Sequence, residues 1–174
     1  MSALNRKFSI TRSTAIRRPS LIRHTPKFYR LKGQDQIFAT ISKDDNFKDA
    51  PDIFETIIPV MNADSSFTPQ YQIIGGFNNN AIQITLPDDS QEESSSDVIQ
   101  WICLLTFTGF QFKYIGPNTK RKVLFALADE DAYCYCDKDP CIECRFKCKN
   151  GFAVYTYWRD KGLYGQDISA FSNK

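Results

Sequence analysis

Five of the six cysteines lie within fifteen residues and carry the clearest potential for chemistry in the chain. Their spacing is C-x-C-x4-C-x2-C-x3-C. A C-x2-C step lets two sulfurs bind one ion from a tight turn, and four thiolates arranged tetrahedrally hold zinc. The sequence therefore predicts a structural zinc site. The expected ligands are Cys136, Cys141, Cys144 and Cys148, with Cys134 as a substitute for one of them.

Disulfide bridges and free thiols are the alternatives for this cluster. Bridges are rare in cytosolic proteins, and the N-terminal residues lack the apolar stretch of roughly 7 to 15 residues that a secretory signal contains. The sixth cysteine, Cys103, stands in an apolar run and is expected to be a small core residue. His24 is the single histidine and lies more than a hundred residues before the cluster, so a Cys–His catalytic pair is not expected. We therefore expect a protein that is not an enzyme.

Charge is distributed very unevenly along the chain, although the formal net charge is only +2. Residues 1–33 carry a charge of +9 with no acidic residue, residues 34–97 carry −10, and residues 98–174 carry +3. A segment with so much charge buries too little apolar surface to offset its ordering entropy. The sequence predicts that residues 1–33 form a disordered basic arm that becomes ordered on a polyanion, because Lys and Arg release counterions from phosphates.

Arginine outnumbers lysine six to three in this arm. Guanidinium groups bind phosphate through two hydrogen bonds and stack on bases, so RNA or a ribonucleoprotein is the expected partner, ahead of an anionic membrane surface. Phe28 and Tyr29 stand between cations and are expected to stack on unpaired bases. A cationic triplet at 120–122 could add phosphate contacts. The predicted binding residues are Arg6, Lys7, Arg12, Arg17, Arg18, Arg23, Lys27, Arg30, Lys32, Lys120, Arg121 and Lys122.

The same N-terminal composition also fits a mitochondrial transit peptide, which would be removed from the working protein. Pro19 and Pro26 would interrupt the amphipathic helix of such a peptide, and the apolar residues there do not share one helical face. We therefore expect the arm to be retained and the protein to act inside the cell. No apolar run reaches the roughly 18 residues that a membrane-spanning helix requires.

The elements expected to carry these residues are mostly strands of a single domain over residues 34–174. Turn residues at 75–80 predict a hairpin between 71–74 and 81–86, and a second hairpin is expected between 110–115 and 123–128. Further strands are expected at 36–41 and 152–158. The acidic stretch 87–97 contains no hydrophobic residue and is expected to be a solvated loop.

One clear helix is expected at residues 98–108, which are apolar around nearly the whole helical circumference. Ser95, Ser96 or Asp97 would cap its start and Gly109 its end. Residues 52–58 fit a short helix or a buried strand equally. The resulting fold class is α+β, a mostly antiparallel sheet with one or two helices.

A basic arm from Arg6 to Lys32 followed by a mixed domain resembles the small capsid and matrix proteins of viruses, and in size and layout the matrix proteins of plant rhabdoviruses. The resemblance implies condensation of nucleocapsid or RNA, self-association into a homo-oligomer, affinity for membranes, and a location in the virion and host cytoplasm. The proline-tyrosine budding motif of many animal rhabdovirus matrix proteins is absent. The alternative is an intracellular, zinc-stabilised nucleic-acid-binding regulator, similar to a silencing suppressor.

Overall fold

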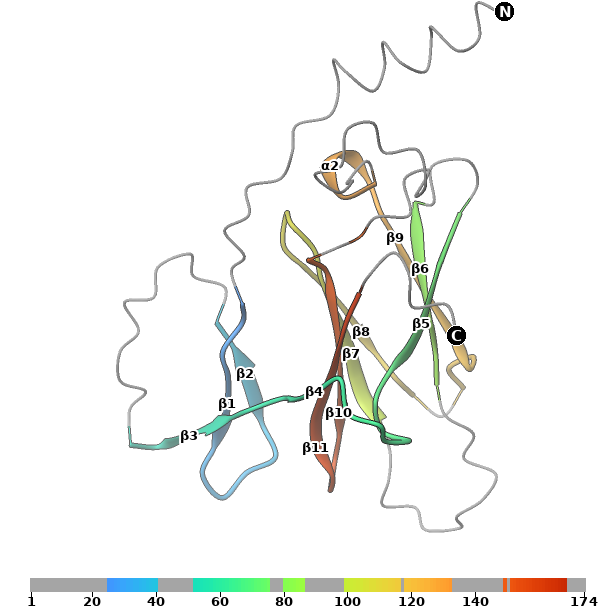
Figure 1. Ribbon diagram of the computed structural model, residues 1–174. Coiled ribbons are helices and arrows are strands. Elements are labelled where there is room, and N and C mark those ends of the chain that lie inside the picture. Colours follow the sequence, from blue (N-terminus) through green and yellow to red (C-terminus); the bar gives the residue numbers. More distant parts are fainter. Residues whose placement is uncertain are drawn as a thin grey trace, which may run out of the picture.

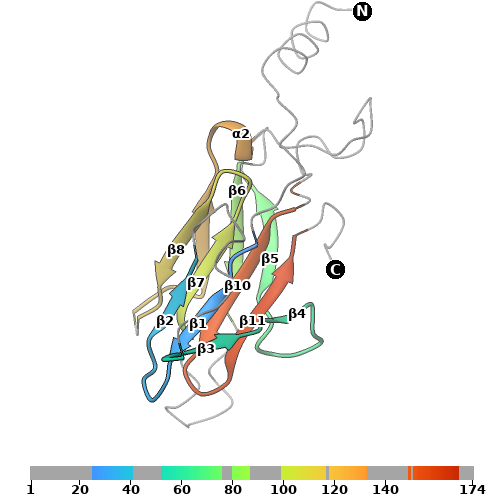
Figure 2. The ribbon, with the colours of Figure 1, turned by 90° about the vertical axis from the view of Figure 1, so that its left-hand side faces the viewer.

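The computed structural model describes residues 25–40, 52–75, 80–86, 99–116, 118–132, 149 and 151–168. Their regular structure is almost entirely β, arranged as three layers (Figures 1 and 2). The order within the layers is β2-β1-β3, then β4-β11-β10-β7-β8, then β5-β6-β9. The five-stranded sheet lies in the middle, so both of its faces are covered at least in part.

The strands are short and pair mostly with antiparallel neighbours. The first outer sheet contains β1 (Phe28–Leu31), β2 (Ile37–Ala39) and β3 (Phe54–Ile57). The middle sheet contains β4 (Val60–Met61), β7 (Ile99–Leu105), β8 (Phe110–Tyr114), β10 (Ala153–Trp158) and β11 (Gly162–Asp167). The second outer sheet contains β5 (Gln70–Ile74), β6 (Ala81–Thr85) and β9 (Lys122–Ala126). One short helix, α2 (Asp129–Ala132), follows β9.

The α+β prediction is wrong, because the described residues form a β-sandwich-like fold. The expected helix at 98–108 is strand β7, which pairs with β8 on one side and β10 on the other. Cys103 and Leu105 pack into one core, whereas Ile102 and Leu104 pack into a second core on the opposite face. A strand covered on both faces is apolar at every position, and that pattern is shared with a buried helix.

Two hydrophobic cores hold the layers together. The larger lies between the middle sheet and the β5-β6-β9 sheet and includes Ile82, Phe125 and Trp158. The smaller lies between the middle sheet and the β2-β1-β3 sheet, where the Phe28 ring lies 5.2 Å from the ring of Tyr155. Side chains alternate between the two cores along β7 and β10, as the period of two of a strand requires.

The first predicted hairpin is confirmed and the second is wrong. β5 and β6 pair antiparallel from Gln70↔Thr85 to Ile74↔Ala81. β8 pairs with β7, whereas β9 pairs with β6 in the other sheet. The turn between β8 and β9 is present, since the Thr119 N–H donates to the Gly116 carbonyl at 2.9 Å. This turn carries the chain from one sheet to the other instead of folding it back on itself.

The strands expected at 36–41 and 152–158 are confirmed as β2 and β10, and the ambiguous segment 52–58 contains the strand β3. Residues 28–31, which the charge pattern assigns to the arm, form β1, the central strand of the first outer sheet. The sandwich therefore begins before Gly33, because Phe28 is needed to fill the smaller core. None of the helices described is long and apolar enough to cross a membrane.

Candidate functional site

The arm cations that the structure describes lie on and beside β1. Lys27 and Lys32 are exposed, and Arg30 is half-buried. The Lys27 N–H donates to Thr40 Oγ1 at 3.1 Å, and the Lys32 N–H donates to the Ile53 carbonyl at 2.9 Å, so the backbone of both residues is fixed by the small sheet. The other predicted binding residues of the arm lie outside the described residues, namely Arg6, Lys7, Arg12, Arg17, Arg18 and Arg23.

Arg30 is partly used by the fold. Arg30 on β1 is paired with Glu55 on the neighbouring strand β3. Residues directly opposite each other in an antiparallel pair have their side chains on the same face of the sheet. The Arg30 Nε is buried without an acceptor among the described atoms. Arg30 therefore offers less to a polyanion than Lys27 or Lys32.

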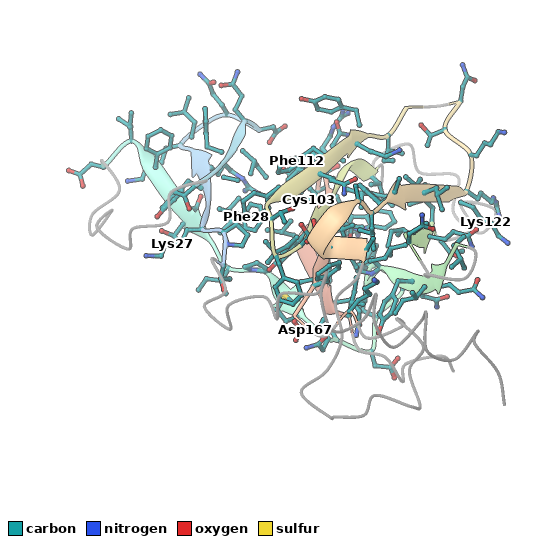
Figure 3. The ribbon with its side chains drawn as sticks, turned by 90° about the horizontal axis from the view of Figure 1, so that it is seen from above. Lys27, Phe28, Cys103, Phe112, Lys122 and Asp167 are labelled. Atoms are coloured by element: carbon teal, nitrogen blue, oxygen red, sulfur yellow. The ribbon has the colours of Figure 1, made fainter. Side chains whose placement is uncertain are left out.

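The second basic set, which we call the loop cations, consists of Lys120, Arg121 and Lys122. All three residues are exposed, and the Arg121 carbonyl accepts a hydrogen bond from the Leu86 N–H at 2.8 Å. Lys27 and Lys122 lie on opposite sides of the molecule (Figure 3). The structure therefore does not join the loop cations to the cations of β1 in one patch.

Phe28 and Tyr29, predicted to stack on bases, are buried. Phe28 is 1% exposed, and its ring also lies 6.1 Å from Trp101 in a stacked arrangement. Tyr29 points to the other face of the small sheet, where Phe54 contacts it edge-on at 6.4 Å. Neither ring presents a face to a base, so the stacking prediction fails for both. Basic neighbours are typical of an exposed segment, but here they flank a short strand whose aromatic side chains are buried.

A buried polar cluster joins the β7–β8 turn to α2. Asp131 is buried, and its Oδ1 accepts hydrogen bonds from the N–H groups of Phe107 (3.1 Å) and Thr108 (3.3 Å). Its Oδ2 accepts from the Thr108 hydroxyl. Lys149 is fully buried, and its Nζ donates to the carbonyls of Asp131 (3.1 Å) and Ala132 (2.6 Å). The cluster supplies hydrogen bonds to backbone groups at a turn and at the end of a helix, which is a structural role.

Lys149 and Ala132 are the described residues that flank the cysteine-rich segment, and the hydrogen bond between them holds them together. The five predicted or substitute zinc ligands, Cys134, Cys136, Cys141, Cys144 and Cys148, lie outside the described residues. Within the described part of the chain, no group of three or more His, Cys, Asp or Glu residues could hold a metal ion. Zinc binding by this segment stays a prediction.

Cys103, in contrast, is described and has the predicted role. It is a free cysteine on β7 with no exposed surface, and it packs in the smaller core. Burial raises the pKa of its thiol above the usual range, because the thiolate would lose its hydration. The Cys103 thiol is therefore protonated and unreactive at neutral pH.

Comparison with known proteins extends to the fold alone. No family model matches the chain, and no curated protein matches it in sequence. The crystal structure of the superoxide reductase from Treponema pallidum is similar in fold, with a TM-score of 0.52 and 13% sequence identity. The similarity covers 81% of this chain and 97% of that chain. At this level of identity, a shared β-sandwich architecture does not transfer an activity.

Two features were missed by sequence reasoning. Asp131 and Lys149 are far along the sequence from the residues to which they are hydrogen-bonded. They belong to no motif of regular spacing, so the sequence does not indicate that they form a buried cluster. The aromatic residues Phe110, Phe112 and Tyr114 were recognised only as an alternating strand. That alternation placed them on one face, but it did not show that β8 lies at the edge of a sheet.

Proposed function

We propose that this protein is a non-enzymatic assembly protein whose N-terminal cations bind RNA while its β-sandwich self-associates. The main support for this proposal is the uneven distribution of charge along the chain. Residues 1–33 contain nine basic residues and no acidic residue, and the segment that follows them has a net charge of −10. Phe28, at the start of β1, is packed in the smaller core of the sandwich. The basic residues from Arg6 to Lys27 therefore precede the point at which the chain is attached to the folded domain.

The geometry of the described cations supports this assignment. Lys27 is exposed just before β1, next to the attachment point, and Lys32 is exposed just beyond the other end of the strand. The loop cations lie on the opposite side of the molecule from Lys27. Contacts to phosphate need charge and access and no rigid pocket, so a basic segment on a stable scaffold is sufficient. Nothing in the described residues bears on the viral resemblance, which stays an expectation, as does its location in a virion.

The superoxide reductase is similar to this chain in fold alone, and its activity is not part of this proposal. The described residues contain no cluster that fits a metal, and the single histidine, His24, lies outside them. The cluster of Asp131 and Lys149 is occupied by backbone hydrogen bonds. The fold is shared, and the proposed function rests on charge.

Neutralising the arm in the full-length chain tests the proposal. Six substitutions by glutamine, at Arg6, Lys7, Arg12, Arg17, Arg18 and Arg23, should weaken binding of a fluorescent oligouridylate by more than about tenfold near 0.1 M salt. Glutamine in place of all three loop cations is the control, and it should cause a smaller loss because those residues lie apart from β1. Fluorescence anisotropy measures both variants against the native chain.

The same experiment also tests the alternative partner, an anionic membrane surface. Vesicles containing phosphatidylserine are titrated in parallel with the RNA. If the arm variant loses vesicle binding while its RNA affinity is unchanged, the arm binds membranes and the RNA assignment is wrong. If both affinities are unchanged, the arm binds neither polyanion.

A further inference from the structure

Among the strands that the structure describes, β8 is an edge strand of the middle sheet. It stands last in the order β4-β11-β10-β7-β8. The Thr106 N–H donates to the Gly109 carbonyl, and the Ile115 N–H donates to the Gln100 carbonyl, which sets the phase of the β7–β8 ladder. Because hydrogen-bonded pairs alternate along an antiparallel ladder, Phe110, Phe112 and Tyr114 point their own N–H and C=O groups away from β7.

The same three residues form the β8 aromatic row, since alternate side chains of a strand share a face. Phe112 is 47% exposed and Tyr114 is 88% exposed, whereas Phe110 packs against the smaller core. The Phe112 ring contacts Trp101 edge-on at 5.7 Å and Phe110 at 6.3 Å, so the row is continuous with the packed interior. In Figure 3, Phe112, Cys103 and Asp167 follow one another across the sheet, with Phe112 at the outer side.

The polar side chains of β8, Gln111 and Lys113, do not block the pairing of another strand with this edge. Gln111 Nε2 donates to the Ala126 carbonyl on β9 at 3.0 Å, and Lys113 Nζ lies 5.4 Å from the centre of the Phe125 ring. Lysine on an edge strand commonly blocks pairing with another chain. Here its ammonium group lies over a core aromatic ring, away from the outward backbone groups of β8.

We propose that β8 is the self-association surface of this protein and pairs antiparallel with β8 of a second copy. A two-fold axis at Phe112 sets Phe112 against Phe112 of the partner subunit, and Phe110 against Tyr114 of the partner subunit. Each of these pairs exchanges two hydrogen bonds, which gives about six in total, and aromatic residues lie directly opposite each other. The proposal deepens the self-association in the proposed function and rests on it.

Charge supports a second copy as the occupant. Lys113 is the one charged residue of β8, and in this register it lies opposite the partner subunit's Gln111. No like charges are therefore directly opposed when the strand meets itself, as isologous two-fold pairing requires. The other edge strand of the middle sheet, β4, has two residues and is too short for a comparable ladder.

Pairing at a two-fold axis makes a specific prediction, because residue 112 meets itself. Phe112→Lys alone and Phe112→Glu alone should each be monomeric, since like charges are opposed and the aromatic contact is lost. An equimolar mixture of the two variants should form dimers again through opposite charges. Leu124→Lys is the matched control, because Leu124 is also 47% exposed at the centre of an edge strand, β9, and should leave the dimer intact.

Sedimentation velocity across a concentration series, with and without oligouridylate, measures the mass of each form. The native chain is expected at about twice the 20.0 kDa of the monomer. If the native chain dimerises and both Phe112 variants dimerise equally well, β8 is not the interface, although self-association stands. If the native chain is monomeric under every condition, both the β8 interface and the self-association in the proposed function are wrong.

Discussion

Asp131→Ala should lower the free energy of unfolding by about 3–5 kcal/mol. The substitution leaves the N–H groups of Phe107 and Thr108 and the Thr108 hydroxyl without their shared acceptor. Each hydrogen bond to a charged group contributes about 1.5–3 kcal/mol. The Phe107 N–H is half-buried, whereas the Thr108 donors are on an exposed residue and can regain water, so most of the loss comes from the hydrogen bonds themselves. Denaturant unfolding followed by tryptophan fluorescence measures the loss.

Asp131→Asn is the matched control for this prediction. Its amide oxygen can still accept one or two of the three hydrogen bonds, so a smaller loss of stability is expected. Lys149→Met should also destabilise the protein, because the carbonyls of Asp131 and Ala132 lose the buried ammonium donor. Equal stability of the alanine variant and the native chain would contradict a structural role for Asp131.

Phe28→Ala is the second large effect, with an expected loss of about 3–5 kcal/mol from removing a buried aromatic ring. The ring lies between Trp101 and Tyr155 in the smaller core, so its removal leaves a cavity beneath the β2-β1-β3 sheet. Thermal unfolding monitored by circular dichroism measures the change. A loss of this size would show that β1 belongs to the folded domain.

Phe38→Ala provides the control within the same small sheet. Phe38 is 45% exposed on the outer face, where it contacts Phe54 edge-on at 5.4 Å. Its truncation should cost clearly less than that of Phe28, because less apolar surface is buried. If both substitutions have equal effects, the packing of Phe28 does not anchor the small sheet.

Local signals predicted those strands whose partners are close in sequence. The β5–β6 hairpin was found because turn-forming residues separate two strand-like runs, and Gly75 indeed adopts a positive φ of 105°. The predicted hairpin between β8 and β9 is wrong because a turn signal does not show which sheet the next strand joins. The helix prediction for residues 98–108 is wrong because the continuous apolar character of this segment reflects the two outer sheets that cover both faces of β7.

The site was predictable to a similar extent. The excess of cations before residue 33 follows from composition, and Lys27 and Lys32 are exposed as a binding role requires. The burial of Phe28 could not be read from its basic neighbours, because it depends on contacts with Trp101 and Tyr155 far along the chain. The same holds for Lys149, whose partners come from the segment before the cysteines.

The salt dependence of RNA affinity tests the central claim most directly. For a single strand, the slope of log affinity against log salt is about −0.7 for each phosphate contacted by a cation. The native chain should therefore show a slope steeper by about 4 than the variant with glutamine at the six arm positions from Arg6 to Arg23. Equal slopes for the two proteins would contradict the claim that the N-terminal cations bind the phosphates.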